Sequence, residues 1–558
     1  MASDSYWRTL IRRKVSRRAV LRAGAAAGTG VAGIALAACG GGEEAPAART
    51  PSVPEGIARA GGNVVMGVDG PPTFGLDPHT EVSTGLQVIP KIYGYMLHQD
   101  PRNESVIPDH AESWEQPDDL TYVVKLRPGI RFQNLPPVNG REVVADDVLA
   151  SFQRFIDNPL VPTKTWYTEI LESMEATDDY TLVFKTNRPY VYTWENLGLI
   201  NAVIIPRELT DYTKVDLNTS GVGSGPFILD KAALSEQIEV VKNPDYFNQP
   251  LPYIDRQTWR IVLDAAIRVA AFKDRQIHVM ANRDRLEMED IAGLSDEVRT
   301  FSKPNLKYVS LGMRVDQPPF NDARVREAID IGLDRQEFIE KMSFGDGEIL
   351  GPINPHLVEG FWSLPQDELT EAYQSGLSSE ERTKTARDMI SAAGALGAKI
   401  TVQTDTRQIA VDIATILESQ LERLGFEAEV EVSELLAWFI NLTQGNFQST
   451  VIDHLAYESP DFPTRWYYSL GTTDVGSWFG YGNSEIDELI VKSWGQFDRE
   501  ERRDTLLEAQ RLMLQEHGPM LNIYTGLEYS SAWGFVKNWR PELPGTLAEY
   551  NYEYWLDL

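Results

Sequence analysis

A single cysteine is the feature that most narrows what this chain of 558 residues can fold into. One cysteine cannot supply a disulfide framework or a thiolate metal cluster within one chain, so the fold must depend on an apolar core. The length allows three or four domains of roughly 150 residues each. The hydrophobic (42%) and charged (24%) fractions are those of an ordinary globular protein. They exclude a disordered, collagenous or polytopic membrane protein.

Charge is distributed unevenly along the chain. The net charge is −30, yet seven basic residues and only one acidic residue precede Cys39. The remaining chain is therefore even more acidic than the whole. A strongly acidic body argues against nucleic acid or anionic lipid as its partner, and its first effect is a well-solvated surface.

The first 38 residues have the layout of an export signal. Basic residues are followed by residues 23–38, sixteen uncharged positions rich in alanine and glycine. This stretch is too short and too weakly apolar for a membrane-spanning helix. Residues 16–21, which contain Arg17-Arg18, resemble the twin-arginine export motif. Leu36-Ala37-Ala38-Cys39 resembles a bacterial lipoprotein box, which implies that the signal peptide is residues 1–38 and that the Cys39 sulfur carries a diacylglycerol.

Residues 39–59 are rich in glycine, proline and acidic side chains, and we expect them to form a flexible tether. Two or more acyl chains at Cys39 would hold the body at a membrane face. We therefore expect the mature protein outside the cytoplasm, in a periplasm or on the outer face of the cell membrane. No other spanning segment is expected.

The body alternates between strand and helix patterns, which indicates a mixed α/β protein. Residues 399–403 have a strand pattern, and residues 409–424 carry an apolar stripe at helical spacing that ends at Gly425. Residues 426–432 then alternate apolar and acidic side chains, as a half-buried strand does. Such a unit predicts two parallel strands joined by a right-handed crossover.

Other segments carry similar local signals. Residues 323–342 predict one helix capped by Asn321 or Asp322, and Ser484 with Asp487 predicts a capping box. Further helices are expected near 144–156 and over 500–517, and further strands over 121–126, 180–185 and 520–524.

Four stretches, in order along the chain, resemble the extracellular solute-binding proteins of family 5. Those proteins bind oligopeptides, dipeptides, nickel chelates and some oligosaccharides for ABC importers. The stretches are Asp77-Pro78-His79; residues 125–132 with 144–148; residues 223–227 with 242–247; and residues 319–329 ending at Asp334-Arg335. Glycine and proline at these positions favour backbone roles, so we interpret the motifs as scaffold that identifies the fold but not the ligand.

The resemblance implies an α/β, two-lobed periplasmic-binding-protein-like fold (class II, cluster C type) with an extra inserted domain. By motif position, lobe I comprises residues 60–98, 219–305 and 525–558. The inserted domain comprises residues 99–218, and lobe II comprises residues 306–524. Such proteins close about a hinge over a ligand held by both lobes, and a permease then recognises the closed form. The resemblance further implies a monomer that works with ABC permease subunits, needs no cofactor and catalyses no reaction.

The resemblance places the ligand-proximal loop at residues 450–463. In peptide-binding members this loop carries an aromatic residue and an aspartate that pairs with the peptide α-amino group. The pattern here differs, and Asp453 is the position we select as anchor, with Glu458 and Asp461 as alternatives. His454 and Tyr457 lie on the same loop. We expect Asp453→Ala to weaken binding of an amine-bearing ligand and to leave the melting temperature of the empty protein nearly unchanged.

Aromatic side chains are dense between residues 438 and 481. Their faces can contact a peptide side chain, a sugar or a cation, and we select Trp438, Trp466 and Trp478 as ligand contacts. By resemblance, Thr73 and Phe74 line the cleft from the first lobe. Short peptides are the leading ligand class, and an oligosaccharide is the alternative that the aromatic residues favour.

Enzyme and metal signatures are missing from the sequence. It contains no G-x-S-x-G, H-E-x-x-H or P-loop motif, and none of its seven histidines are four residues apart. A lone His454 does not make a metal site, although it could contact a metal chelate. Pairs among the 82 acidic residues leave an exported glycoside hydrolase as the rival from another class.

Overall fold

A sheet of twelve strands runs through the part of the chain that the computed structural model describes, which is residues 56–81, 83–158, 166–219, 221–282, 284–453, 458–469, 478–541 and 552–557. Neighbouring strands follow the order β10-β11-β12-β1-β13-β20-β15-β19-β17-β18, and β14 and β16 also pair with β20. The signal peptide, Cys39 and the tether up to residue 55 lie outside the described residues.

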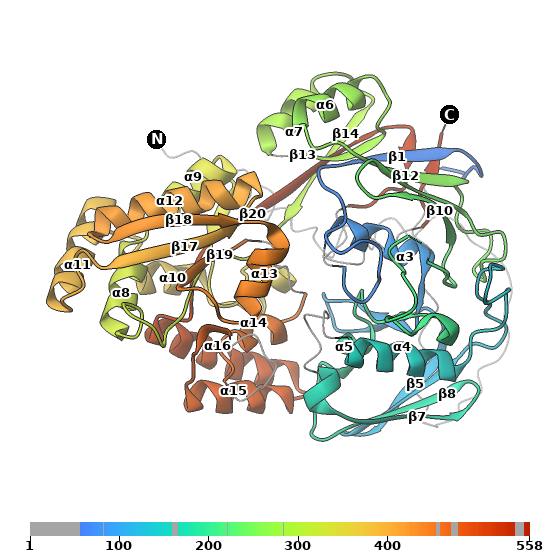
Figure 1. Cartoon of the computed structure of the whole chain (residues 1–558), viewed down its shortest axis with the longest axis horizontal. Coiled ribbons are helices and arrows are strands. Elements are labelled where there is room, and N and C mark those ends of the chain that lie inside the picture. Colours follow the sequence, from blue (N-terminus) through green and yellow to red (C-terminus); the bar gives the residue numbers. More distant parts are fainter. Residues whose placement is uncertain are drawn as a thin grey trace, which may run out of the picture. The chain divides into compact units, whose positions relative to one another are not determined.

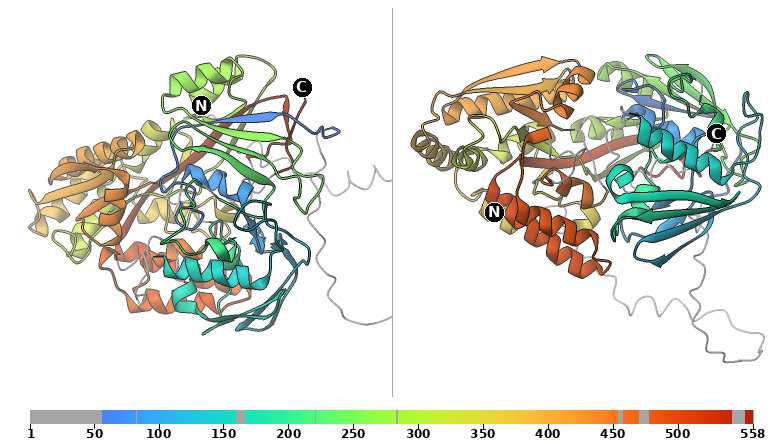
Figure 2. Two further views of the ribbon diagram at one scale, coloured as in Figure 1. Left: turned by 45° about the vertical axis from the view of Figure 1, so that its right-hand side comes forward. Right: turned by 60° about the horizontal axis from the view of Figure 1, so that its bottom comes forward.

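Strand β20 (Met520–Trp533) joins the two halves of this sheet. Its residues 527–533 pair with β13 and β14, whereas its residues 520–526 pair with β15 and β16. Figures 1 and 2 show this long strand passing from one half to the other. The first half contains β1 (Asn63–Val68), β10 (Phe227–Ala233), β11 (Gln237–Lys242), β12 (Arg256–Ile261), β13 (Val279–Asn282) and β14 (Val298–Pro304). The second half contains β15 (Val309–Met313), β16 (Gly347–Ile349), β17 (Lys399–Asp405), β18 (Glu427–Ser433) and β19 (Ser449–Ile452).

The strand-helix-strand unit predicted over residues 399–432 is confirmed. Strands β17 and β18 pair in parallel, and α12 (Gln408–Leu424) connects them. From Ile413 onward the apolar stripe of α12 is buried against the sheet, where Leu417 and Leu421 join one core with β17 and β19. Ile409, at the start of the predicted stripe, is 49% exposed. Gly425 ends the helix with a φ of 102°, a left-handed conformation that costs other residues energy.

The single helix predicted over residues 323–342 is wrong, because two helices occupy this stretch. α8 (Ala323–Gly332) ends before an extended Leu333, and α9 (Arg335–Ser343) begins after it. Asp334 accepts a hydrogen bond from the backbone N–H of Glu337 at 3.3 Å, so it caps α9 rather than continuing α8. Asp322 caps α8 by accepting from the N–H of Arg324 at 2.9 Å, as one of the two predicted alternatives requires.

The capping box predicted at Ser484 is also wrong by one residue. Asn483 is the N-cap of α15 (Ser484–Trp494), and its Oδ1 accepts from the backbone N–H groups of Glu485 at 3.0 Å and Ile486 at 3.3 Å. Asparagine is as good a cap as serine, and the sequence pattern alone did not separate the two neighbours.

Replacing the true cap should therefore cost stability. We expect Asn483→Ala to lower the free energy of unfolding by about 1 kcal/mol, because two N–H groups of the first turn lose their acceptor. Ser484→Ala should change it by less than about 0.5 kcal/mol, since alanine is a good residue inside a helix. Denaturant titrations of both variants measure the difference, and equal effects would contradict the assignment of Asn483 as cap.

A separate antiparallel sheet of four strands is formed by residues that follow β1 and precede β10 in the sequence. Its order is β5-β6-β8-β7, from β5 (Ala111–Asp118), β6 (Thr121–Leu126), β7 (Leu171–Asp178) and β8 (Thr181–Thr186). Helix α4 (Ala145–Asp157) packs on it through an apolar face that includes Val148, Phe152 and Phe155. The predicted turn at Pro128-Gly129 is present, with Gly129 at a φ of 87°.

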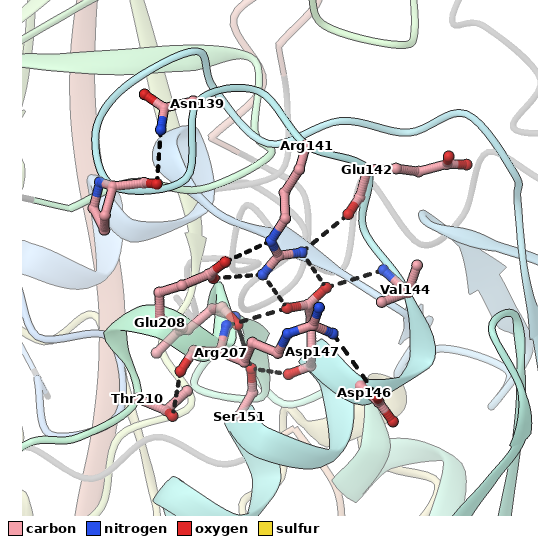
Figure 3. A network of polar contacts seen from close by, with 12 residues as sticks. Asn139, Arg141, Glu142, Val144, Asp146, Asp147, Ser151, Arg207, Glu208 and Thr210 are labelled. Atoms are coloured by element: carbon pink, nitrogen blue, oxygen red, sulfur yellow. Dashed lines mark hydrogen bonds and ion pairs between the residues drawn. The ribbon is translucent and has the colours of Figure 1, made fainter.

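The first turn of α4 is fixed by a partly buried polar network (Figure 3). Arg141 donates to both oxygens of Asp147 at 2.8 and 2.6 Å and to both oxygens of Glu208 at 2.7 and 2.5 Å. Asp147 is fully buried and also accepts from the backbone N–H groups of Val144 at 3.0 Å and Arg207 at 3.1 Å. These contacts are structural, as the interpretation of this motif as scaffold requires.

A second buried network connects the Asp77-Pro78-His79 stretch to α4. Arg154 donates to Asp77 Oδ1 and to His79 Nδ1, each at 2.9 Å. Burial opposes ionisation of Asp77, but its hydrogen bonds with Arg154 and the charge of that residue hold its pKa below the usual value. Burial and the neighbouring guanidinium lower the pKa of His79 to about 3, so its ring is neutral.

The remaining elements surround these sheets. Short pairs are formed by β2 (Gly94–Tyr95) with β9 (Val203–Ile204), β3 (Leu97–Gln99) with β4 (Val106–Pro108), and β21 (Val536–Lys537) with β22 (Trp555–Leu556). The other α-helices are α3 (Ile89–Ile92), α5 (Thr193–Leu197), α6 (Ala265–Lys273), α7 (Arg285–Ala292), α10 (Gln366–Ala372), α11 (Ser379–Ala392), α13 (Leu435–Thr443), α14 (Asp461–Arg465) and α16 (Arg499–Glu516). Among the described residues no helix has the length and apolar character needed to cross a bilayer.

Candidate functional site

The carboxyl ends of two parallel strands bring together three charged side chains. Asp405 ends β17, and Asp453 directly follows β19, which lies beside β17 in parallel register. Arg407 Nη2 contacts Asp405 Oδ2 and Asp453 Oδ1, each at 2.6 Å. Ligands of open α/β sheets bind outside such carboxyl ends, so this edge is a candidate ligand site.

The two carboxylates are almost completely buried, and Arg407 is partly exposed. Burial alone would lower the pKa of Arg407, but the hydrogen bond and charge of Asp405 and the charge of Asp453 raise it above its usual value. The guanidinium is therefore always charged, and Asp453 already has a cationic partner. A ligand ammonium that uses Asp453 must share it with Arg407.

Thr73 and Phe74 lie on the loop that follows the carboxyl end of β1. The backbone N–H of Phe74 donates to Glu81 at 2.7 Å, and that of Thr73 donates to Ser83 at 2.9 Å, which fixes the loop. The ring of Phe74 meets the ring of Phe439 on α13 edge-on, with centroids 6.2 Å apart. The first-half loop thus contacts the helix beside the Asp405–Asp453 edge. Glu81, which is fully buried, was not selected from the sequence.

The structure places the selected tryptophans mostly in the core. Trp438 on α13 is buried, and its Nε1 donates to Thr450 Oγ1 at 2.9 Å. Trp466 is also buried, and it packs edge-on against the partly buried Trp478 with centroids 6.0 Å apart. These contacts bring Trp466 and Trp478 together, and they keep Trp438 beside the strand that leads to Asp453. His454 and Tyr457 lie outside the described residues.

Comparison with known proteins shows the family of this chain. Residues 105–477, about two thirds of the chain, match the model of the bacterial extracellular solute-binding proteins, family 5, middle region. The chain belongs to this family. It is therefore a solute-binding protein, as the four motifs predicted.

Individual relatives agree with this assignment. Over 496 residues this solute-binding protein is 24% identical to the oligopeptide-binding protein AppA of Bacillus subtilis (strain 168). The alignment covers 84% of this chain and 87% of AppA. The structure is similar to the ABC transporter-associated periplasmic binding protein DppA from Helicobacter pylori, solved in complex with the peptide STSA. That match has a TM-score of 0.77, 24% identity and coverage of 90% of this chain and 99% of DppA.

A third match has a different ligand. AgaA from A. tumefaciens R10, solved in complex with agropinic acid, matches with a TM-score of 0.76 and 21% identity over 89% of this chain and 99% of AgaA. The structural matches confirm the predicted mixed α/β, two-lobed periplasmic-binding-protein fold.

One arrangement in this solute-binding protein looks like hydrolase chemistry. His110 Nε2 lies 2.8 Å from Ser224 Oγ, and His110 Nδ1 lies 3.5 Å from Asp109 Oδ1. Both Ser224 and His110 are only 1% exposed, so no substrate carbonyl can reach the hydroxyl without local unfolding. The chain also offers no group of three or more metal-ligating side chains within the described ranges.

The burial of Asp453 changes one expectation from the sequence. We expect Asp453→Ala to lower the free energy of unfolding of the empty protein by about 1–3 kcal/mol, because Arg407 loses one of its two buried acceptors but keeps Asp405. Asp412→Ala, on the exposed face of α12, should change it by less than about 0.5 kcal/mol. Thermal unfolding of both variants without ligand tests this, and an unchanged melting temperature for Asp453→Ala would show that the ion pair contributes nothing.

Proposed function

We propose that this solute-binding protein captures short peptides outside the cytoplasm and delivers them to the permease of an ABC importer. The observation that carries the proposal is the family match over residues 105–477. The peptide class is supported by the relatives, since AppA of B. subtilis is an oligopeptide-binding protein and H. pylori DppA was solved with a peptide. The proposed ligand contacts are Asp453, Trp478, Thr73, Phe74, His454 and Tyr457.

Capture proceeds by hinge closure. The proposed hinge lies where β14 ends at Pro304 and β15 begins at Val309, beside the middle of β20. On the two sides of this point β20 pairs with different strands, which supports the predicted boundaries between lobe I, ending at residue 305, and lobe II, beginning at residue 306. A ligand that contacts both lobes stabilises the closed form by its differential affinity.

The proposed location is a membrane face outside the cytoplasm. A diacylglycerol on Cys39 anchors the monomer there after export through the twin-arginine route and removal of residues 1–38. The protein itself makes and breaks no covalent bond, and other subunits of the importer use ATP. The alternative ligand is an oligosaccharide, and the structural match to AgaA with agropinic acid is consistent with a fold that accepts a non-peptide solute.

A thermal-shift screen of the protein without residues 1–56 tests the proposal. Di-, tri- and tetrapeptides are compared with oligosaccharides and metal chelates. A peptide present at 100 times its Kd should stabilise the protein by about 2.7 kcal/mol, which raises the melting temperature by several degrees. A shift only with glycans would overturn the peptide class, and turnover of a glycan in the same wells would favour the hydrolase.

A further inference from the structure

A small cavity lies apart from the Asp405–Asp453 edge, between α5 and the residues that precede α14. Its walls include Glu104, Tyr192, Glu195, Trp362, Glu458 and Ser459, and its volume is about 30 Å³. That volume matches the space of one water-sized group. The hydrogen bond from Ser459 Oγ to Glu195 Oε1, at 2.7 Å, connects the two sides of the cavity. Figure 1 shows α5 facing α14 across this junction.

Two buried polar atoms at this cavity, one on Tyr192 and one on Glu195, have no hydrogen-bond partner among the described residues. Tyr192 is 3% exposed, and its hydroxyl bonds to nothing among the described residues. Glu195 as a residue is partly exposed, but its Oε2 atom is buried and likewise has no partner in that part of the chain. Buried polar atoms in folded proteins nearly always have a partner, so each unsatisfied one calls for a ligand or a water. A carboxylate oxygen and a hydroxyl oxygen at one cavity can both accept from a donor placed there.

The charge around Glu195 is negative. Burial, followed by the charge of Asp461, raises the pKa of Glu195 to about 8, and Glu458 and Glu104 act in the same direction. The cations nearby are already engaged, since Arg502 pairs with Glu104 at 2.6 Å and Arg465 pairs with Asp461 at 2.7 Å. No ion pair reaches Glu195 within the ranges that the structure describes.

We infer that this cavity is a subsite for a primary ammonium group of the ligand. An ammonium group has three donors and no acceptor, which fits Glu195 Oε2 and the Tyr192 hydroxyl, and its size fits the cavity. A planar guanidinium is larger and needs a fork of acceptors. The inference rests on the proposed function, because the ammonium group is carried by a bound peptide, either at its amino terminus or on a lysine side chain.

Binding of an ammonium group favours the ionised form of Glu195. Because that carboxyl is mostly protonated at pH 6, binding must release a proton, and affinity rises as the pH increases from 6 to 7.5. The polar side chains that face this carboxyl are Ser459, Glu458, Asp461 and Glu104. Arg465 pairs with Asp461, and Arg502 pairs with Glu104. Below pH 7 the affinity for the ammonium group should rise by close to tenfold for each unit of increase in pH.

Calorimetric titration of the detergent-purified protein tests the inference. The probes are Ala-Lys-Ala, Ala-norleucine-Ala and N-acetylated Ala-Lys-Ala. We expect the peptide that lacks the bound ammonium group to bind at least tenfold more weakly than Ala-Lys-Ala. Weaker binding of the norleucine peptide identifies the lysine side chain as the source of that group. Weaker binding of the acetylated peptide identifies the amino terminus as the source. Glu195→Gln, which keeps the size of the side chain, should abolish both this discrimination and the pH dependence, and Tyr192→Phe should reduce the discrimination.

Glu172→Gln, an exposed glutamate on β7, is the matched control and should behave like the unmodified protein. Melting curves show whether each variant is folded. If Glu195→Gln and Tyr192→Phe both keep the discrimination and the pH slope, the cavity holds only water and the inference is wrong while the proposed function stands. If none of the peptides binds, the proposed function fails, and this inference fails with it.

Discussion

Replacing Asp147 by alanine is expected to lower the free energy of unfolding by about 3–5 kcal/mol, because Arg141 loses a buried partner. Asp147 is fully buried and accepts four hydrogen bonds, two from Arg141 and two from backbone N–H groups. One of those N–H groups belongs to Val144 at the start of α4, and the other belongs to Arg207. Removal of the carboxylate therefore releases the start of α4 together with the segment around Arg207. Urea titration followed by tryptophan fluorescence measures the loss.

Asp146→Ala is the matched control. Asp146 is the preceding residue in α4, its side chain is 69% exposed, and its contact with Arg207 is 3.7 Å long. Exposed pairs of this kind contribute between 0 and about 1 kcal/mol. If Asp147→Ala unfolds at the same urea concentration as Asp146→Ala, the network in Figure 3 does not contribute to the free energy of unfolding.

Acid is expected to destabilise the protein through His79. Its pKa is about 3 in the folded chain and near 6.5 when the chain is unfolded, so between these values the unfolded state binds the extra proton. The free energy of unfolding therefore falls as the pH decreases from 6.5 to 3, by about 3–5 kcal/mol from this residue. Asp77, whose folded pKa is also lowered, adds a loss in the same direction below about pH 4.

His79→Gln should remove most of the loss between pH 6.5 and 4.5, because glutamine can still accept from Arg154 but does not titrate. The free energy of unfolding, measured by urea titration at half-unit pH steps, should then vary less with pH in the variant than in the unmodified protein. Identical slopes for the two proteins would mean that His79 is protonated in the folded state, against the assignment made here.

Local elements could be predicted from the sequence where one stretch of chain contains all the information. The unit over residues 399–432 is such a case, because the alternation, the helical stripe and Gly425 lie within it. The errors occurred where two neighbouring residues compete. Asn483 and Ser484 are both good caps, and Leu333 interrupts a stretch whose apolar spacing continues on both sides.

The candidate site was less predictable, because its contacts join distant segments. Asp453 looks like a free carboxylate in the sequence, yet Arg407, 46 residues earlier, occupies it. Trp438 and Trp466 stay predicted ligand contacts, and the sequence did not indicate that tertiary packing buries both rings. Glu195 and Ser459 are separated by 264 residues, and nothing local to either one indicates the hydrogen bond between them.

The measurement that tests the central claim most directly is the distance between the two sides of the proposed hinge. The protein without residues 1–56 contains no cysteine, so Ser235→Cys, between β10 and β11 in lobe I, and Ser419→Cys, on α12 in lobe II, provide two unique and exposed sites for spin labels. We predict that a short peptide which raises the melting temperature also shifts the distribution of distances between the two spin labels to shorter values. The fraction of molecules with the shorter distance should increase in proportion to the fraction of protein that has peptide bound. A distribution that stays unchanged when the protein is saturated with that peptide would contradict capture by closure.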